Sequence, residues 1–325
     1  MRILSYFCLI ILLSACSDGA NNNGVYPQEN ISIVIPYGPG GGFDTTVRVF
    51  SPHFARKLGN DVTLLPENMP GTGGRRGTAM ISRSDPDGYT IGILNLPGLV
   101  LPSILGEKVD FQLREMSWIG RIESQNYALL VQADSHIQSL DDFIAEEEIT
   151  FVSIGYGTTV LAAIQIVAEQ LGLMDKDIKF LTGYSGTSDQ LVALVRGDGN
   201  ATITPISTSF QYVKSGNLRP IVVTGDSRSS YYPDTPTFAE LGHPVLSQLN
   251  VQRSLAGPPG MDPAVLGKLR EAFLQVMEDP EFLAAASQAQ MDIAPLNGEM
   301  AAAEIDKNFQ YYEGFKANLS NPNQL

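Results

Sequence analysis

Short strand-like patterns alternate with helix-like patterns along most of this chain. Strands are predicted where Val, Ile, Leu and Thr gather between turn residues, in 31–37, 61–68, 90–95, 150–155, 201–207 and 219–225. Helices are predicted where apolar residues recur at steps of three and four before a glycine, in 44–58, 158–171 and 188–196. Such an alternation predicts an α/β fold, with mainly parallel sheets that carry helices on both faces.

The first residues have the pattern of a secretion signal. A basic second residue precedes an apolar run, 3–13, that is shorter than the about 20 residues of a permanent membrane span. The run ends in L-S-A-C at 13–16, which resembles a bacterial lipobox and predicts a signal peptide, 1–15, and a lipid on Cys16. An ordinary signal peptide with a cysteine at its cleavage site is the alternative. Residues 16–30 are polar and predict a flexible tether.

The charge and cysteine content restrict the partners and the compartment. The 325 residues include 21 Lys and Arg against 35 Asp and Glu, a formal net charge of −14. We therefore expect no nucleic-acid partner. The cysteines are Cys8, in the predicted signal, and Cys16, so we expect neither a disulfide nor a free thiol in the mature protein. The roughly 300 residues that follow exceed one typical domain and suggest two.

Three glycine-bearing loops follow predicted strands or lead into predicted helices: PYGPGGGFD at 36–44, NMPGTGGRRGT at 68–78 and SIGYGTT at 153–159. Glycine lets backbone N–H groups turn toward one point, and a helix N-terminus behind them adds partial positive charge. Such loops bind anions without any Lys or Arg. The sequence therefore predicts an anion site in an acidic protein, at the carboxyl ends of the strands.

Each of these features also has a purely structural interpretation. The glycines can simply form turns, and Asp44 can cap a helix by accepting from the N–H of Val47. Arg75 and Arg76 can be solvated surface residues. The tyrosines near the loops can be packing residues: Tyr37, Tyr156 and Tyr184. The occurrence of similar loops together, without a catalytic set to serve, favours ligand binding.

Residues that carry catalysis are sparse. The histidines, His53, His136 and His243, are far apart in sequence. The sequence lacks the zincin, C-x-x-C, nucleophile-elbow and P-loop motifs. The run GTGGRRG approaches a dinucleotide fingerprint but has Arg76 in place of the last glycine. We therefore expect no catalysis, no cofactor and no metal; a hydrolase that uses carboxylates is the alternative left open.

Several segments carry a family resemblance that spans nearly the whole mature chain. PYGPGGGFD at 36–44, DPDGYT at 85–90 and PDTPTFAELG at 233–242 form a specific combination. In these segments the chain resembles the Bug-type substrate-binding receptors of tripartite tricarboxylate transporters. The resemblance implies a type II periplasmic-binding-protein fold, two doubly wound α/β domains with a ligand cleft between them. The implied domains are 31–123 plus 224–325 for domain 1, and 124–223 for domain 2.

The resemblance also implies a small carboxylate ligand gripped from both domains. Gly41 and Gly42 would supply backbone donors from the first domain, and Thr158 and Thr159 would supply donors from the second. Asp44 would order its loop or meet an amine on the ligand. The implied ligand-binding residues are Tyr37, Gly40, Gly41, Gly42, Asp44, Asn68, Gly71, Asn95, Ser153, Gly155, Gly157, Thr158, Thr159, Tyr184 and Thr204.

Some positions depart from the family pattern. Met69 stands where an arginine is usual, and Leu161 and Ala162 stand where a His-Leu pair is common. The segment 183–186 lacks the basic residue of its counterparts. The loss of cations favours a ligand with fewer charges than citrate, such as a monocarboxylate, an amino acid or an aromatic acid.

The mechanism implied by the resemblance is capture by domain closure about hinges near 122–123 and 223–225. The closed receptor would then deliver its ligand to the membrane subunits of the transporter. We expect a monomer in the periplasm, lipid-anchored to a bacterial membrane through Cys16. The apolar pattern of 301–315 predicts an amphipathic helix that packs on a domain. A sensor that presents the closed receptor to a signalling partner, and a periplasmic enzyme, are the alternatives.

Overall fold

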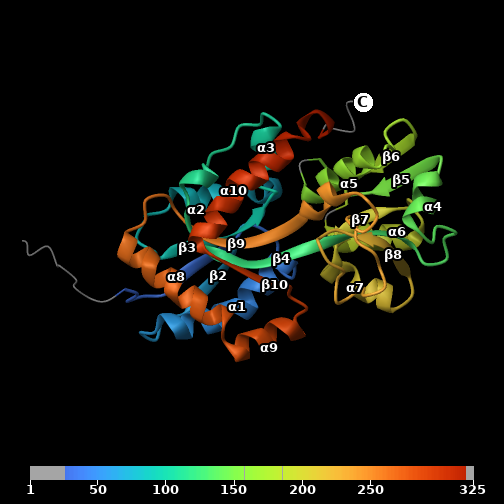
Figure 1. The fold of residues 1–325 in the computed structure, drawn as a ribbon. Helices are drawn as coiled ribbons and strands as arrows, with labels where there is room; N and C mark the ends of the chain where they lie inside the picture. Colours follow the sequence, from blue (N-terminus) through green and yellow to red (C-terminus); the bar gives the residue numbers. More distant parts are fainter. Residues whose placement is uncertain (1–25, 157, 185, 320–325) are drawn as a thin grey trace, which may run out of the picture.

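Two lobes joined by long strands make up the protein (Figure 1). The structure is a computed structural model and describes residues 26–156, 158–184 and 186–319. The first lobe contains β1 (Ile31–Ile35), α1 (Gly42–Leu58), β2 (Leu64–Asn68), α2 (Arg75–Arg83), β3 (Thr90–Leu96), α3 (Leu101–Ile104), β9 (Asn250–Gly257), α8 (Pro263–Met277), α9 (Pro280–Gln288), β10 (Ile293–Asn297) and α10 (Gly298–Glu313). The second lobe contains α4 (Leu140–Ala145), β5 (Glu148–Val152), α5 (Thr159–Gln170), β6 (Asp177–Leu181), α6 (Thr187–Arg196), β7 (Thr202–Pro205), α7 (Ile206–Lys214) and β8 (Leu218–Val223). The strand β4 (Ser117–Gln132) runs through both lobes.

The central sheet is mixed rather than mainly parallel. Its strand order is β10-β4-β9-β3-β1-β2, with β7 and β8 also paired to β4. β1 is parallel to β2 and β3, whereas β4 and β9 are antiparallel to each of their described partners. The expectation of mainly parallel sheets is therefore wrong for this sheet. The physical reason is that β4 carries the chain into the second lobe and β9 carries it back, so the two strands run in opposite directions.

β4 changes its partners where it passes from one lobe to the other. Its residues up to Asn126 pair with β9, and from Tyr127 onward they pair with β7 and β8. Tyr127 faces Pro205 in this register. The junction between the lobes therefore lies in the middle of a continuous strand, where a side chain can contact both lobes.

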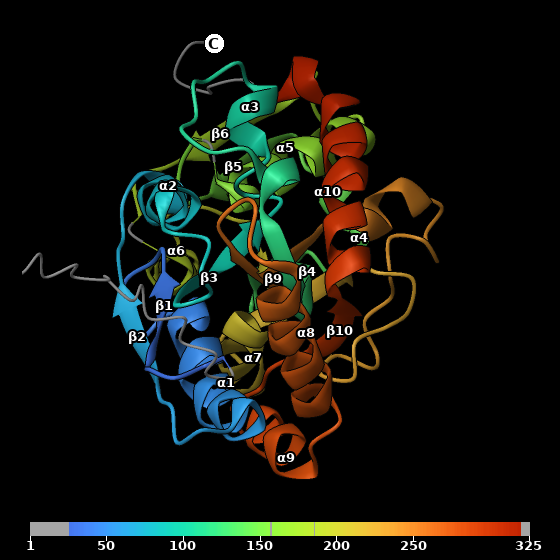
Figure 2. The same ribbon diagram turned by 90° about the vertical axis from the view of Figure 1, so that its left-hand side faces the viewer.

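The first lobe is held by aromatic side chains between α1, α8 and α9, which lie together in Figure 2. Phe50 and Phe54 of α1 are fully buried, with ring centroids 4.8 Å apart. The Phe50 ring also lies 6.1 Å from Phe273 and 5.9 Å from Phe282. The apolar pattern predicted for 44–58 is thus the buried face of α1, which begins two residues earlier, at Gly42.

The segment after β8 continues along the second lobe before the chain returns. The hydroxyls of Tyr232 and Ser209 lie 2.8 Å apart, and the N–H of Thr224 donates to the carbonyl of Tyr127 at 2.9 Å. The chain crosses back to the first lobe in β9. The domain boundaries expected from the sequence, at 123/124 and 223/224, remain a prediction.

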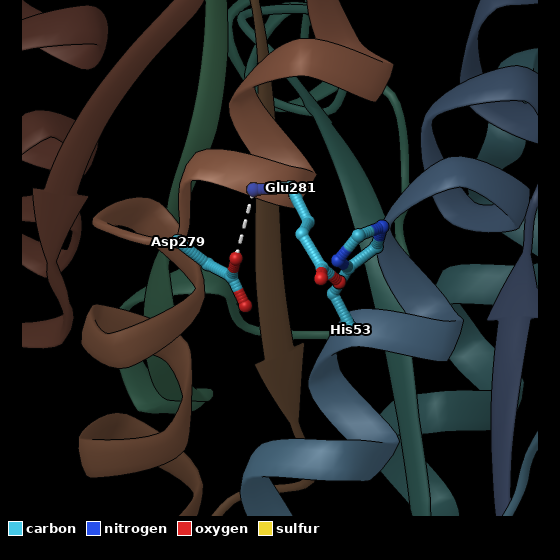
Figure 3. Close-up of side chains that lie close together, drawn as sticks. All are labelled: His53, Asp279 and Glu281. Atoms are coloured by element: carbon cyan, nitrogen blue, oxygen red, sulfur yellow. Dashed lines mark hydrogen bonds between the residues drawn. The ribbon is translucent and has the colours of Figure 1, made fainter.

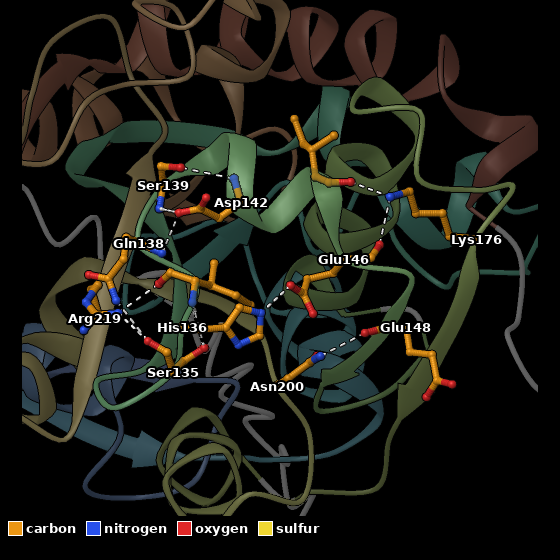
Figure 4. A network of polar contacts seen from close by, with 12 residues as sticks. Ser135, His136, Gln138, Ser139, Asp142, Glu146, Glu148, Lys176, Asn200 and Arg219 are labelled. Atoms are coloured by element: carbon orange, nitrogen blue, oxygen red, sulfur yellow. Dashed lines mark hydrogen bonds and ion pairs between the residues drawn. The ribbon is translucent and has the colours of Figure 1, made fainter.

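At the far end of the second lobe, charged side chains donate hydrogen bonds to backbone carbonyls (Figure 4). The ammonium of Lys176 donates to the carbonyl of Glu146 at 2.8 Å. Arg219 Nη1 donates to the carbonyls of Ser135 and Ile137, at 3.1 and 2.9 Å. These bonds satisfy loop carbonyls that have no strand partner, so this network stabilises the loops on either side of α4.

The predicted signal peptide, the lipid on Cys16 and the tether up to residue 25 lie outside the described residues. Within residues 26–319, the described helices are all too short or too polar to cross a membrane.

Candidate ligand-binding cleft

A cleft of about 560 Å³ lies between the two lobes. The first lobe contributes the loop between β1 and α1 and the loop 70–74. The second lobe contributes residues 158–160 and 186–187, and Tyr127 borders the cleft at the junction. Residues from both sides of the hinge strands therefore surround one space.

The N-terminal ends of helices from both lobes border this cleft. The lining includes Gly42 of α1, Thr159 of α5 and Thr187 of α6, each in the first turn of its helix. The N-cap positions of α1 and α6 are Gly41 and Gly186, and no described side chain accepts a capping hydrogen bond there. Backbone N–H groups of the first turn and the helix dipole make such ends anion sites. Opposing lobes therefore offer donors to the same ligand.

The electrostatics of the cleft differ from those of the whole chain. Within the described lining, Arg253 is the one charged side chain, and no carboxylate borders the space. Burial raises the pKa of Tyr127 to about 12, so its hydroxyl stays protonated at neutral pH. Arg253 is itself paired with the buried carboxylate of Glu123 at 2.6 Å, so the donors that remain for an anion are mainly uncharged backbone N–H and hydroxyl groups.

Asp44 lies outside the cleft lining and forms hydrogen bonds that stabilise the first glycine loop. Its Oδ2 accepts from the N–H of Gly40 and from Arg48 Nε, both at 2.9 Å. Its Oδ1 accepts from Asn68 Nδ2 at 3.0 Å. The hydrogen bond from Arg48 is the largest cause that lowers the pKa of Asp44 to about 2. The prediction that Asp44 caps the helix through the N–H of Val47 is wrong, because α1 begins at Gly42 and Asp44 lies in its first turn.

Tyr37 and the second glycine loop form one wall of the cleft. The rings of Tyr37 and Phe43 stack with centroids 4.4 Å apart, and the Tyr37 hydroxyl donates to the carbonyl of Gly73 at 3.3 Å. Gly74 adopts φ +93°, and a Cβ at this position would lie 2.6 Å from the Tyr37 oxygen. Glycine is therefore required at position 74 both for its backbone conformation and for the close approach of Tyr37.

Arg253 is a cleft residue that sequence reasoning missed. It lies on β9 and is 6% exposed, and its Nη1 donates to Glu123 Oε2 at 2.6 Å. The guanidinium carbon lies 5.0 Å from the centroid of the Phe43 ring. The sequence feature that could have indicated this residue is its position as a single arginine in the otherwise uncharged stretch NVQRSLAG.

The structure brings together about half of the residues expected to bind ligand. The cleft lining includes Tyr37, Gly41, Gly42, Gly71, Asn95, Thr158 and Thr159. Outside it lie Gly40, Asp44, Asn68, Ser153, Gly155, Tyr184 and Thr204. The Tyr184 hydroxyl instead donates to Asp198 Oδ2 at 3.0 Å. Gly157 lies outside the described residues, and the binding roles of the whole set remain predictions.

His53, Asp279 and Glu281 form a cluster at the surface between α1 and α9 (Figure 3). Their potential ligand atoms all lie within 4.8 Å of one another, as in many metal sites. However, Arg56 Nη2 lies 2.8 Å from both His53 Nδ1 and Glu281 Oε2, and Lys57 Nζ lies 2.9 Å from Asp279 Oδ2. Cationic side chains thus already neutralise the carboxylates, and the cluster links α1 to α9.

Comparison with known proteins places the chain among receptors. A family model described as tripartite tricarboxylate transporter family receptor (TctC) matches residues 46–308. The UPF0065 protein in gbd 5'region of Cupriavidus necator is 29% identical over 286 residues, which cover 85% of this chain and 83% of that protein.

Solved structures share the fold. The periplasmic binding protein BugD is 22% identical with a TM-score of 0.76, covering 90% of this chain and 98% of that chain. MatC from Rhodopseudomonas palustris, solved with bound malate, is 20% identical with a TM-score of 0.76, covering 90% of this chain and all (100%) of that chain. The predicted periplasmic-binding-protein fold is confirmed by these matches.

Proposed function

The chain belongs to the tripartite tricarboxylate transporter receptor family, as its resemblance to Bug-type receptors predicted, and on this premise we propose that it captures a small carboxylate outside the cytoplasm and delivers it to the membrane subunits of such a transporter. The family and the fold are those of solute-binding receptors.

One observation carries the proposal: helix N-termini from opposite lobes, with glycine at the N-cap positions of α1 and α6, border the same cleft. Gly41 and Gly186 precede α1 and α6 and offer no side-chain oxygen to the first-turn N–H groups. A carboxylate between the lobes would accept from both sets of N–H groups at once. Because the donors come from separate lobes, ligand binding would favour the closed arrangement over the open one.

Closure about the crossing strands is the proposed mechanism of capture. β4 and β9 connect the lobes, and β4 exchanges its partners between Asn126 and Tyr127. We place the hinges near 122–123 and 223–225, with lobes of residues 31–123 plus 224–325 and 124–223. A rotation there would bring residues 158–160 and 186–187 toward the first glycine loop.

A thermal-shift screen tests the proposed ligand class. The protein from Ser17 onward is unfolded and refolded to remove bound ligand, then mixed with mono-, di- and tricarboxylates, amino acids and aromatic acids. A carboxylate present at about 100 times its Kd should stabilise the fold by ~2.7 kcal/mol. We expect such a shift with at least one carboxylate, which should be recovered chemically unchanged. A panel without any shift, or conversion of the ligand, would contradict the proposal.

Membrane attachment is proposed to depend on Cys16, which lies outside the described residues. In a bacterial host, the full-length protein should fractionate with membranes and incorporate a fatty-acid label. The Cys16→Ser variant should lose the label and appear as a monomer in the soluble periplasmic fraction. Retention of the variant in the membrane would show that attachment has another origin.

A further inference from the structure

A second cavity, of about 470 Å³, lies between the lobes on the other face of β4 from the ligand-binding cleft. Successive side chains of a strand point to opposite faces. Tyr127 borders the cleft, whereas Ser124 and Asn126 border the second cavity. The rest of its wall comes from α9 and residues 291–294 of the first lobe, and from Ile206 and residues 227–231 of the second. We call this space the rear cavity.

The rear cavity has walls from both lobes, so its shape depends on how the lobes are oriented. The proposed closure narrows the cleft by bringing residues 158–160 toward the first glycine loop. Because β4 has the cleft on one face and the rear cavity on the other, a rotation about this strand that narrows the cleft separates the walls of the rear cavity. A ligand that contacts both of these walls would therefore oppose the rotation.

Asp292 carries a charge at this cavity that has no counter-ion. It is only partly exposed, and its carboxyl makes no hydrogen bond or ion pair with another described residue. Burial is the largest cause that raises the pKa of Asp292 from 3.8 to about 6, and repulsion by Glu123 adds to it, whereas attraction by Arg253 lowers it. At neutral pH the carboxyl is therefore ionised at a cost, which a cation beside it would reduce.

The other charges at this cavity are already paired. Arg228, which borders the space, donates from Nε to both carboxylate oxygens of Glu240, each at 3.0 Å. Glu123, the acid that repels Asp292, is paired with Arg253 at 2.6 Å. Within the described lining, Asp292 thus contributes an unmatched negative charge, and the cavity favours a cation.

The size and the ligand set of the cavity favour an organic cation over a metal ion. A calcium ion takes about six to eight oxygen ligands, and its affinity rises with the number of charged ones. Among the described residues, Asp292 belongs to no cluster of three or more side chains that could hold a metal. The volume instead falls within the roughly 300–1,000 Å³ of sites for small organic molecules.

The remaining polar groups suit an ammonium ion. Serine hydroxyls border the space from both lobes, among them Ser287 and Ser230, and their oxygens can accept from N–H groups. Tyr231 also borders it, and its ring is held edge-on against Phe210 with centroids 5.1 Å apart. Aromatic rings attract ammonium ions through their negative faces. An amine with a short organic body would therefore find a carboxylate, acceptors and an aromatic ring in one space.

We propose that the rear cavity binds a small organic ammonium ion, whose charged group pairs with Asp292 while its body lies between the two lobes, and that this binding opposes closure of the cleft. The cation would act as an antagonist of carboxylate capture. The ammonium site goes beyond the proposed receptor function, and the antagonism rests on it.

Calorimetric titration at pH 7.5 and constant ionic strength tests the site. Benzylamine and butylamine are compared with benzyl alcohol and butanol, and with calcium chloride. The proteins are the wild type, Asp292→Asn and, as a control for net charge, Asp226→Asn, whose side chain is exposed and outside the lining. Asp292→Asn should fold, because the raised pKa of Asp292 means that its ionised carboxyl destabilises the folded protein at this pH.

We expect at least one amine to bind the wild type at least tenfold more tightly than its matched alcohol and than calcium. Asp292→Asn should lose at least tenfold in affinity for this amine, and Asp226→Asn less than threefold. An amine that binds no better than its alcohol, equal losses in the two variants, or tighter binding of calcium would overturn the ammonium site.

A second titration tests the antagonism. With the amine at saturation, the wild type should bind its carboxylate at least threefold more weakly, and the carboxylate should weaken amine binding by the same factor. Asp292→Asn should bind the carboxylate equally with and without the amine. A carboxylate affinity that the amine leaves unchanged or increases would overturn the antagonism. Absence of carboxylate binding would refute the receptor function and the antagonism with it, while the amine titrations still decide the ammonium site.

Discussion

At the scale of single residues, the side chains around the cleft divide into groups that border the ligand space and groups that hold the loops. Tyr37 and Arg253 border the ligand space. Asp44 instead accepts hydrogen bonds from Gly40, Arg48 and Asn68. The glycine loops could be located from the sequence because glycine and helix starts have local signatures. The Arg253–Glu123 ion pair could not be predicted from the sequence, because it joins residues 130 positions apart.

Gly41 and Gly42 provide a matched pair of substitutions. A Cβ at Gly42 would displace the Arg253 guanidinium, whereas one at Gly41 would meet nothing closer than the Gly38 oxygen at 3.7 Å. Because the displaced guanidinium is paired with the buried Glu123, we expect Gly42→Ala to lower the melting temperature as well as to weaken ligand binding at least tenfold by titration calorimetry. Gly41→Ala should weaken binding less than threefold. Equal effects of the two substitutions would show that Arg253 is not involved.

Asp44→Asn tests the support of the first loop. The pKa of Asp44 is lowered from 3.8 to about 2, so the folded state favours the carboxylate. This stabilisation is present above pH 4 and is lost as the pH falls through about 2. We expect Asp44→Asn to lower the free energy of unfolding by about 1–2 kcal/mol at pH 7 in urea titrations. The difference from wild type should shrink between pH 4 and pH 2; a difference independent of pH would argue against the ionised carboxylate as its cause.

At the scale of helices and strands, local patterns predicted the elements with strong periodicity. α1, α5 and α6 lie where apolar steps of three and four end at a glycine, and the predicted C-terminal helix is α10. β4 and β9 were missed, although they organise the sheet. Both are mixed in composition, with polar residues such as Gln125 and Gln252 buried at the junction of the lobes. Their strand character comes from long-range pairing, which a local pattern does not contain.

The N-terminus of α6 offers a test of the helix-end account. Thr187 borders the cleft, whereas Ser188 in the same turn is exposed and outside it. Aspartate at either position complements the helix dipole. We expect Thr187→Asp to weaken carboxylate binding at least tenfold because its own carboxylate competes for the donors. Ser188→Asp should weaken binding less than threefold; if both variants bind equally well, α6 is not part of the site.

At the scale of the whole molecule, the fold places donors from two lobes on either side of one cleft and joins the lobes by β4 and β9. The length of the mature chain suggested two domains, and the resemblance of whole segments predicted the two-lobed architecture. The position at which β4 changes partners required the three-dimensional structure, because only the pairing register identifies it.

Closure should be visible in solution. We expect small-angle X-ray scattering to show a smaller radius of gyration when the wild type is saturated with its carboxylate, because the lobes rotate together. Thr187→Asp, with its site impaired, should keep the radius of the unliganded protein at the same ligand concentration. An unchanged radius for the saturated wild type would show that binding occurs without closure.

The most direct measurement is a crystal structure of the protein with the best carboxylate from the thermal-shift screen. The account predicts a carboxylate oxygen within hydrogen-bonding distance of first-turn N–H groups of α1 and of a donor from the second lobe, in the cleft between them. A carboxylate bound outside this cleft, or held in it without any helix N-terminus, would contradict the account.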